Sequence, residues 1–103
     1  GRPGPLGMYQ SFIDLRVYPP SSVLKVDDTP PGIAEGVAAG CPTVGVALSG
    51  NIAGRTPEEL AALPPAEVDA IRDTATAILR EAGATHVIDT VADLPRLIEA
   101  EWP

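Results

Sequence analysis

One stretch decides the fold: Ser22-Val23-Leu24-Lys25-Val26-Asp27-Asp28-Thr29-Pro30-Pro31-Gly32. Its apolar, β-branched first half predicts a short strand over Val23–Val26. Pro30 and Pro31 cannot donate strand hydrogen bonds and favour a first helical turn, so the strand must end near the two aspartates. In open α/β sheets, ligands bind at the carboxyl ends of the strands. This strand end is therefore the first candidate for a functional site.

Together with the residues that follow, as far as Leu48, this strand predicts a strand–helix–strand unit. A helix is expected over Pro31–Ala39, with Ile33 and Val37 on one face and Gly40 just past its end. The nearly continuous apolar run Thr43–Leu48 is typical of a parallel strand that is buried on both faces.

The rest of the chain completes an α/β pattern. A capping box at Thr56 and Glu59 marks a helix start. The remaining expected elements are helices over Leu6–Leu15, Pro57–Leu63 and Pro65–Ala82, a strand over His86–Asp89, and a last helix starting at Thr90 or Asp93. The predicted fold is a partial Rossmann-like, doubly wound parallel sheet of about three strands with flanking helices.

Composition narrows the class of protein. The 103 residues carry 14 acidic side chains against seven Lys and Arg, a net charge of −7, which argues against a nucleic-acid partner. No apolar run approaches the roughly 20 residues needed to cross a bilayer, so no membrane association is expected. A single cysteine, Cys41, cannot form an internal disulfide, and a cytoplasmic location is the default expectation.

The aspartate pair Asp27-Asp28 is the strongest local feature, with two interpretations. Carboxylates at the carboxyl end of a parallel strand, beside a helix N-terminus, can hold Mg²⁺. Alternatively, both acids cap the following helix and complement its dipole. From the pattern alone, capping is the commoner role.

Five other features carry weaker signals. Arg2 could clamp a phosphate or lie in a frayed terminus. Ser49-Gly50-Asn51 could donate backbone N–H groups to an anion or form a simple turn. Thr29 could bind a ligand or cap a helix. His86 has no second metal-ligating partner in the sequence and is interpreted as structural, and Cys41 as a small core residue.

Several strings together resemble the phosphonoacetaldehyde hydrolases (phosphonatases) of the haloacid dehalogenase superfamily. The chain resembles the carboxyl-terminal part of these enzymes along essentially all of its 103 residues. The strings that carry the resemblance are Gly1-Arg2-Pro3-Gly4-Pro5, Val17-Tyr18-Pro19-Pro20, Lys25-Val26-Asp27-Asp28-Thr29, Gly32-Ile33-Ala34-Glu35-Gly36 and Ser49-Gly50-Asn51.

The resemblance implies a chemistry for these residues. Members of the family cleave the C–P bond of phosphonoacetaldehyde to acetaldehyde and phosphate, with an aspartate nucleophile, a Schiff-base lysine in a cap domain, and Mg²⁺. Arg2 matches the family's phosphoryl-stabilising basic residue, and Asp28 matches its Mg²⁺ ligand. Asp27 makes that motif a double aspartate. Gly32 stands where some members have a second acid, so the metal site would depend on Asp27 and Asp28.

The resemblance also implies what these residues lack. The nucleophile strand and the cap domain would precede Gly1, and the only lysine, Lys25, does not match the cap position. We therefore expect 1–103 to be the carboxyl-terminal part of a core domain, inactive alone, from an enzyme that binds a small phosphonate and forms a homodimer when intact. Without its neighbouring strand, Val23–Val26 would expose an edge and favour self-association. The alternative is a non-catalytic interaction module, or relic fragment, that pairs through this edge. A stand-alone metal-binding domain of receiver type is a weaker third hypothesis, since it needs an acid on an earlier strand.

Overall fold

Three parallel strands form the centre of the molecule, in the order β1-β2-β3. The computed structural model describes residues 23–50 and 52–102. The strands are β1 (Lys25–Asp27), β2 (Thr43–Val46) and β3 (His86–Ile88). In register, Val26 lies opposite Val44, and Gly45 lies opposite Val87. The predicted fold class, a three-stranded parallel α/β sheet with flanking helices, is confirmed.

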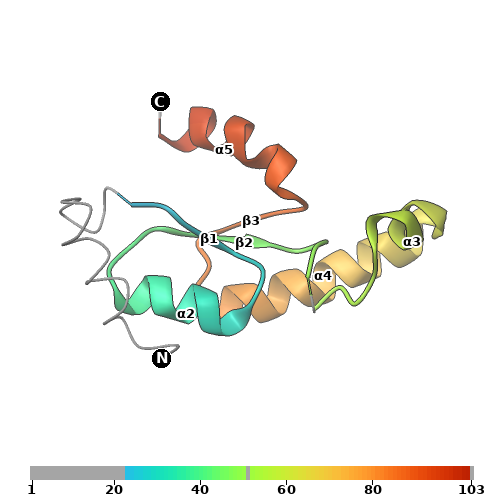
Figure 1. Ribbon diagram of the computed structural model, residues 1–103, viewed down its shortest axis with the longest axis horizontal. Helices are drawn as coiled ribbons and strands as arrows, with labels where there is room; N and C mark the ends of the chain where they lie inside the picture. The colour runs from blue at the N-terminus through green and yellow to red at the C-terminus, as the bar shows by residue number, and fades with distance from the viewer. Residues whose placement is uncertain (1–22, 51, 103) are drawn as a thin grey trace.

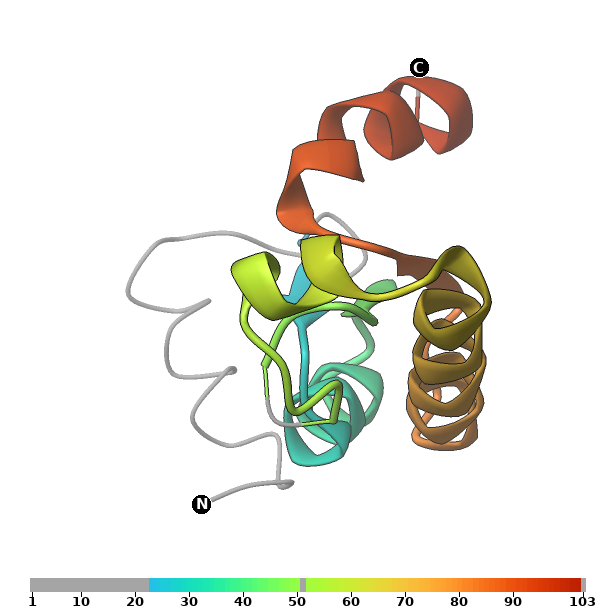
Figure 2. The same cartoon turned by 90° about the vertical axis from the view of Figure 1, so that its right-hand side faces the viewer.

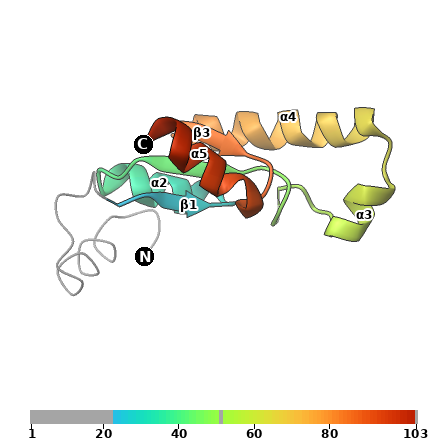
Figure 3. The same cartoon turned by 90° about the horizontal axis from the view of Figure 1, so that it is seen from above.

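Helices cover both faces of this sheet (Figure 1). Figure 2 shows α2 (Pro30–Ala38) and α4 (Pro65–Glu81) side by side on one face, with α5 (Leu94–Glu101) on the other. A 3-10 turn, η2 (Val91–Asp93), leads into α5. The short helix α3 (Pro57–Ala62) lies beyond the carboxyl ends of the strands (Figure 3). The predicted helix over Leu6–Leu15 lies outside the described residues.

The core lies between the sheet and the pair α2 and α4. Ile33 from α2, Val44 from β2 and Leu79 from α4 are fully buried. Gly45 allows the close packing of α4, because a Cβ at this position would lie 3.0 Å from the Cβ of Leu79. β2 is buried along its whole length, as its near-continuous apolar sequence predicts for a central parallel strand.

Four predicted strand boundaries differ from the observed ones: both ends of β1, which ends at Asp27 rather than Val26, the end of β2, and the end of β3, which is Ile88 rather than Asp89. β1 begins at Lys25 rather than Val23, since pairing starts where Lys25 N–H donates to the Pro42 carbonyl at 2.9 Å. β2 ends at Val46 rather than Leu48, although the Ala47 N–H donates to the carbonyl of Ile88, the last residue of β3, and the Leu48 N–H donates to the carbonyl of Asp89 just after it. Each of these boundary errors is two residues or fewer. At β1, Pro30 and Pro31, which follow the aspartates, keep the strand from extending further.

Candidate functional site at the carboxyl edge of the sheet

A cavity of about 220 Å³ lies where the three strands end. The end of β1, the segment after β2 and the 3-10 turn after β3 each contribute to its wall. The lining residues are Val26, Asp27, Asp28, Val46, Ser49 and Val91. Because all three strands are parallel, segments far apart in the sequence meet at this one edge. The predicted location of the site is therefore hollow and carries carboxylates.

Asp28 lies against the loop that follows β2. A Cβ on Gly50 would overlap the Asp28 carboxyl group, so the glycine leaves room for that carboxylate. Gly50 also has a φ of 80°, a conformation that side chains other than glycine rarely adopt. The sequence Ser49-Gly50-Asn51 left open an anion-binding turn; in the structure Gly50 lies next to an anionic side chain, that of Asp28. Asn51 lies outside the described residues.

Asp27 has a different environment from its neighbour. Its Oδ1 accepts hydrogen bonds from the Thr29 N–H at 2.8 Å and from the Thr29 hydroxyl at 2.7 Å. Its Oδ2 lies 3.5 Å from Lys25 Nζ. Both carboxylate oxygens of Asp27 thus have partners within the fold.

Lys25 links β1 to α2. Its Nζ lies 3.5 Å from Asp27 and 3.7 Å from Glu35, and all three side chains are largely buried, with 11–17% exposed. A Cβ at Gly36 would lie 2.6 Å from the Lys25 Cγ, so this glycine lets the helix approach the lysine stem. This cluster of Lys25, Asp27 and Glu35 was not predicted from the sequence. The alternation of Lys25 and Asp27 on one face of the strand was the signal available.

Thr29 is the N-cap of α2. Its side-chain oxygen accepts the Gly32 N–H at 3.1 Å. Of the two interpretations of Thr29, the cap is observed, and in the described structure it is Thr29 rather than Asp27 that takes this position. The helix-cap interpretation of the aspartates therefore does not describe Asp27, which instead accepts from the cap residue.

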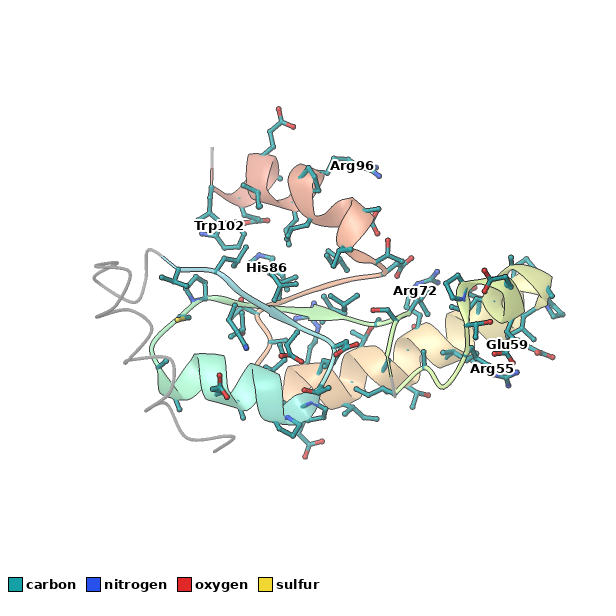
Figure 4. The ribbon with its side chains drawn as sticks, viewed as in Figure 1. Arg55, Glu59, Arg72, His86, Arg96 and Trp102 are labelled. Carbon is teal, nitrogen blue, oxygen red and sulfur yellow. The ribbon has the colours of Figure 1, made fainter. Side chains whose placement is uncertain are left out.

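A third acid, Asp89, follows β3 at the same edge. Arg72 of α4, which is labelled in Figure 4, donates from Nε to Asp89 at 2.7 Å and from an Nη to Asp69 at 2.6 Å. These hydrogen bonds raise the pKa of the Arg72 guanidinium, Asp89 contributing most. Asp89 thus joins β3 to α4.

His86 contacts the carboxyl-terminal helix. Its Nε2 lies 3.6 Å from a Glu101 carboxylate oxygen, and Trp102 packs edge-on with ring centroids 5.3 Å apart. Figure 4 shows His86 and Trp102 pointing toward one another between the sheet and α5. These contacts agree with the structural role expected for His86.

Other predicted site residues are placed as follows. Arg2 lies outside the described residues. Cys41 is buried beside Ala39, as expected for a small core residue.

Within 23–50 and 52–102, no group of three or more His, Cys, Asp or Glu side chains gathers closely enough to hold a metal ion. None of the helices in these ranges combines the length and apolar character needed to cross a bilayer.

The chain is similar in sequence to known proteins along most of its length. Over 95% of its length the chain is 47% identical to phosphonoacetaldehyde hydrolase from Klebsiella pneumoniae and 49% identical to that from Aeromonas hydrophila. The chain is similar to phosphonoacetaldehyde hydrolases. The predicted resemblance is confirmed. The chain spans 36% and 35% of the length of these two relatives, about a third of each.

Solved structures of related proteins also have a fold similar to that of this chain. A phosphonoacetaldehyde hydrolase-like protein from Oleispira antarctica superposes with a TM-score of 0.91 and 44% identity, covering 97% of this chain and 36% of that protein. A haloacid dehalogenase-like protein of unknown function from Agrobacterium tumefaciens shares the fold, with a TM-score of 0.66 at 24% identity over 96% of this chain and 36% of that one. No protein-family model matches the chain.

Proposed function

We propose that this chain forms the magnesium-binding edge of a phosphonoacetaldehyde hydrolase active site, where C–P bond cleavage yields acetaldehyde and phosphate. The observation that carries the proposal is Asp28, which lines the cavity at the strand ends in a chain similar to these enzymes over 95% of its length. A small phosphonate is the substrate that this proposal implies, and a cytoplasmic location stays a prediction.

Asp28 is the proposed Mg²⁺ ligand. Carboxylate oxygen is a ligand that Mg²⁺ favours, and Gly50 leaves space at the carboxylate where a larger residue would intrude. When bound, Mg²⁺ would screen the charges of the phosphonate and the surrounding carboxylates from one another. Asp27 contributes less directly, since its two oxygens already contact Thr29 and Lys25.

The remaining catalytic groups are proposed by resemblance. Arg2 would stabilise the phosphoryl group. The aspartate nucleophile and the Schiff-base lysine would come from a segment other than these 103 residues. Lys25 is a poor candidate for the Schiff base because it is held between Asp27 and Glu35 with only 17% of its side chain exposed.

Complementation tests this function. The chain is mixed with the amino-terminal part of the Klebsiella pneumoniae relative, the part that it does not match, and phosphate release from phosphonoacetaldehyde is followed with Mg²⁺ present. We expect turnover in the mixture and none from the chain alone. Asp28→Asn should lower the mixture's rate by about 100-fold or more, because the metal ligand is lost.

The matched control is Asp73→Asn, the same substitution at an exposed position of α4, which should leave the rate unchanged. Robust turnover by the chain alone would refute the proposed division of catalytic groups. An Asp28→Asn mixture as active as the unsubstituted one would refute the proposed metal ligand.

A non-catalytic interaction module is the second candidate. The observation that favours it is the outer edge of β1, with which no strand within the described ranges pairs. Unpaired strand edges recruit other strands. If this is the function, the chain should co-purify with the amino-terminal part of a relative while the mixture releases no phosphate.

A further inference from the structure

Asp27 and Asp28 are adjacent in sequence but differ in surroundings. Asp27 lies against α2, where a Cβ on Gly32 would overlap its carboxylate. Asp28 lies against Gly50 in the loop after β2. Since successive residues of a strand point to opposite faces, this separation follows from the strand geometry at the end of β1. The two carboxylates therefore contact different parts of the fold.

Asp27 closes a turn around its neighbour. The bond from the Thr29 N–H to the Asp27 Oδ1, 2.8 Å long, forms a ring that contains the backbone of Asp28. This is an Asx turn, in which a side chain takes the place of a backbone carbonyl. The Thr29 hydroxyl adds a second bond to the same oxygen and accepts from Gly32 N–H, so the turn continues into the start of α2.

Lys25 anchors the other oxygen of Asp27. Its Nζ lies 3.5 Å from Oδ2 and 3.7 Å from Glu35 on the second turn of α2. Because these side chains are mostly shielded from water, their attraction is screened less than that of a surface pair. The Asp27 carboxylate is thus fixed at both oxygens by β1, the turn and α2.

We propose that Asp27 is a positioning residue that orders the backbone at Asp28 and so holds the Asp28 carboxylate at the cavity for Mg²⁺. This role rests on the proposed magnesium site. It assigns the two aspartates different functions: Asp28 is the ligand, and Asp27 fixes the ligand's orientation without contacting the metal. Supporting residues of this kind tune metal affinity although they do not bind the ion.

The test compares Asp27→Asn with Asp27→Ala in the full chain. Asparagine keeps a side-chain oxygen that accepts from Thr29, whereas alanine removes it. Magnesium chloride is titrated while the Gly50 and Asp28 amide signals are followed by NMR. We expect Asp27→Ala to weaken Mg²⁺ binding by about tenfold or more, and Asp27→Asn by about threefold or less. Asp73→Asn serves as the control for loss of one negative charge.

A measurement without metal tests the positioning role of Asp27 independently of the proposed magnesium site at Asp28. Amide relaxation should show greater fast motion at Asp28 in Asp27→Ala, but not in Asp27→Asn, while circular dichroism confirms that both variants fold. Equal loss of Mg²⁺ affinity in both variants would make Asp27 a ligand and overturn the positioning role. An Asp28 amide as ordered in Asp27→Ala as in the unsubstituted chain would also overturn it. Failure of Mg²⁺ to shift Gly50 in the unsubstituted chain would instead refute the proposed metal site.

Discussion

Gly45 is the residue at which the sheet and α4 come closest. A Cβ here would lie 3.0 Å from both the Cβ and a Cδ of Leu79, which is itself fully buried. Gly45→Ala should therefore destabilise the fold by about 1–3 kcal/mol through overpacking, measured by urea denaturation. In a Leu79→Ala background, the same substitution should cost less, because the Cγ and Cδ atoms that it meets are gone and only the Cβ at position 79 remains. Additive losses would contradict this contact.

The buried thiol of Cys41 makes the folded state less stable at alkaline pH. Burial raises the pKa of the thiol above its ordinary value of 9.0, and the positive charge of Lys25 offsets this only in part. The folded state thus holds the thiol proton more tightly than the unfolded state, so the contribution to stability is present below pH 9 and declines as the pH rises above it. The melting temperature should fall more between pH 8 and about pH 10 in the unsubstituted chain than in Cys41→Ala. Parallel pH profiles would count against a raised thiol pKa.

At the scale of the element, α3 depends on its capping box. The Thr56 hydroxyl accepts the Glu59 N–H at 3.1 Å, and the Glu59 carboxylate accepts the Thr56 N–H at 2.9 Å. The Thr56 backbone hydrogen bond, followed by the Thr56 side-chain bond, lowers the pKa of Glu59 below 4.5. Because the pKa of Glu59 is lower in the folded helix than in the unfolded chain, the ionised carboxylate stabilises the helix at any pH above the unfolded pKa. This stabilisation is lost as the pH falls through the folded pKa.

The substitution Thr56→Ala tests how much the Thr56 side chain of the capping box lowers the pKa of Glu59. The substitution should return the Glu59 pKa part of the way toward 4.5, because the backbone N–H remains while the side-chain bond is lost. NMR titration of the Glu59 side chain measures this. Glu58→Gln in the same helix is the matched control and should leave the Glu59 pKa near its original value. An unchanged pKa in Thr56→Ala would show that the side-chain bond contributes nothing.

The helix α5 depends on contacts at its carboxyl end. It contains no buried residue, and its described contacts include Trp102 and Glu101 against His86. Trp102→Ala should therefore raise amide hydrogen exchange throughout 94–101 while exchange in α4, which holds the buried Leu79, stays the same. Uniform acceleration in both helices would mean that α5 is coupled to the whole core.

At the scale of the whole molecule, the edge of the sheet controls association. β1 has three residues and pairs on one side with β2, and no described strand covers its other side. We predict that the purified chain self-associates or melts broadly, since a small α/β layer with an open strand is marginal alone. Sedimentation across a concentration series measures this. A sharp two-state melt of a monomer at low concentration would contradict it.

Local sequence signals were sufficient to predict the described strands and helices and to mark one strand end as a candidate site. Prolines, glycines and the Thr56 capping box mark where helices start and end, because these residues act on their own backbone. The unbroken apolar run at Thr43–Leu48 indicated a central parallel strand. Asp27 and Asp28 were marked as candidates for the same reason, since acids next to a strand end can be recognised from neighbouring residues alone.

The tertiary structure decided what each aspartate contacts. Sequence treats the pair as one feature, whereas packing separates them: Gly32 of α2 meets Asp27, and Gly50, 22 positions from Asp28, meets Asp28. Glu35, on α2, completes the Lys25 cluster across the β1–α2 turn. Such contacts depend on the order and parallel register of the strands, which bring distant loops to one edge. Backbone propensity acts over a few residues, so the sequence by itself determined the strand end and the acids there. Only the assembled sheet determined which glycine and which helix or loop each carboxylate contacts.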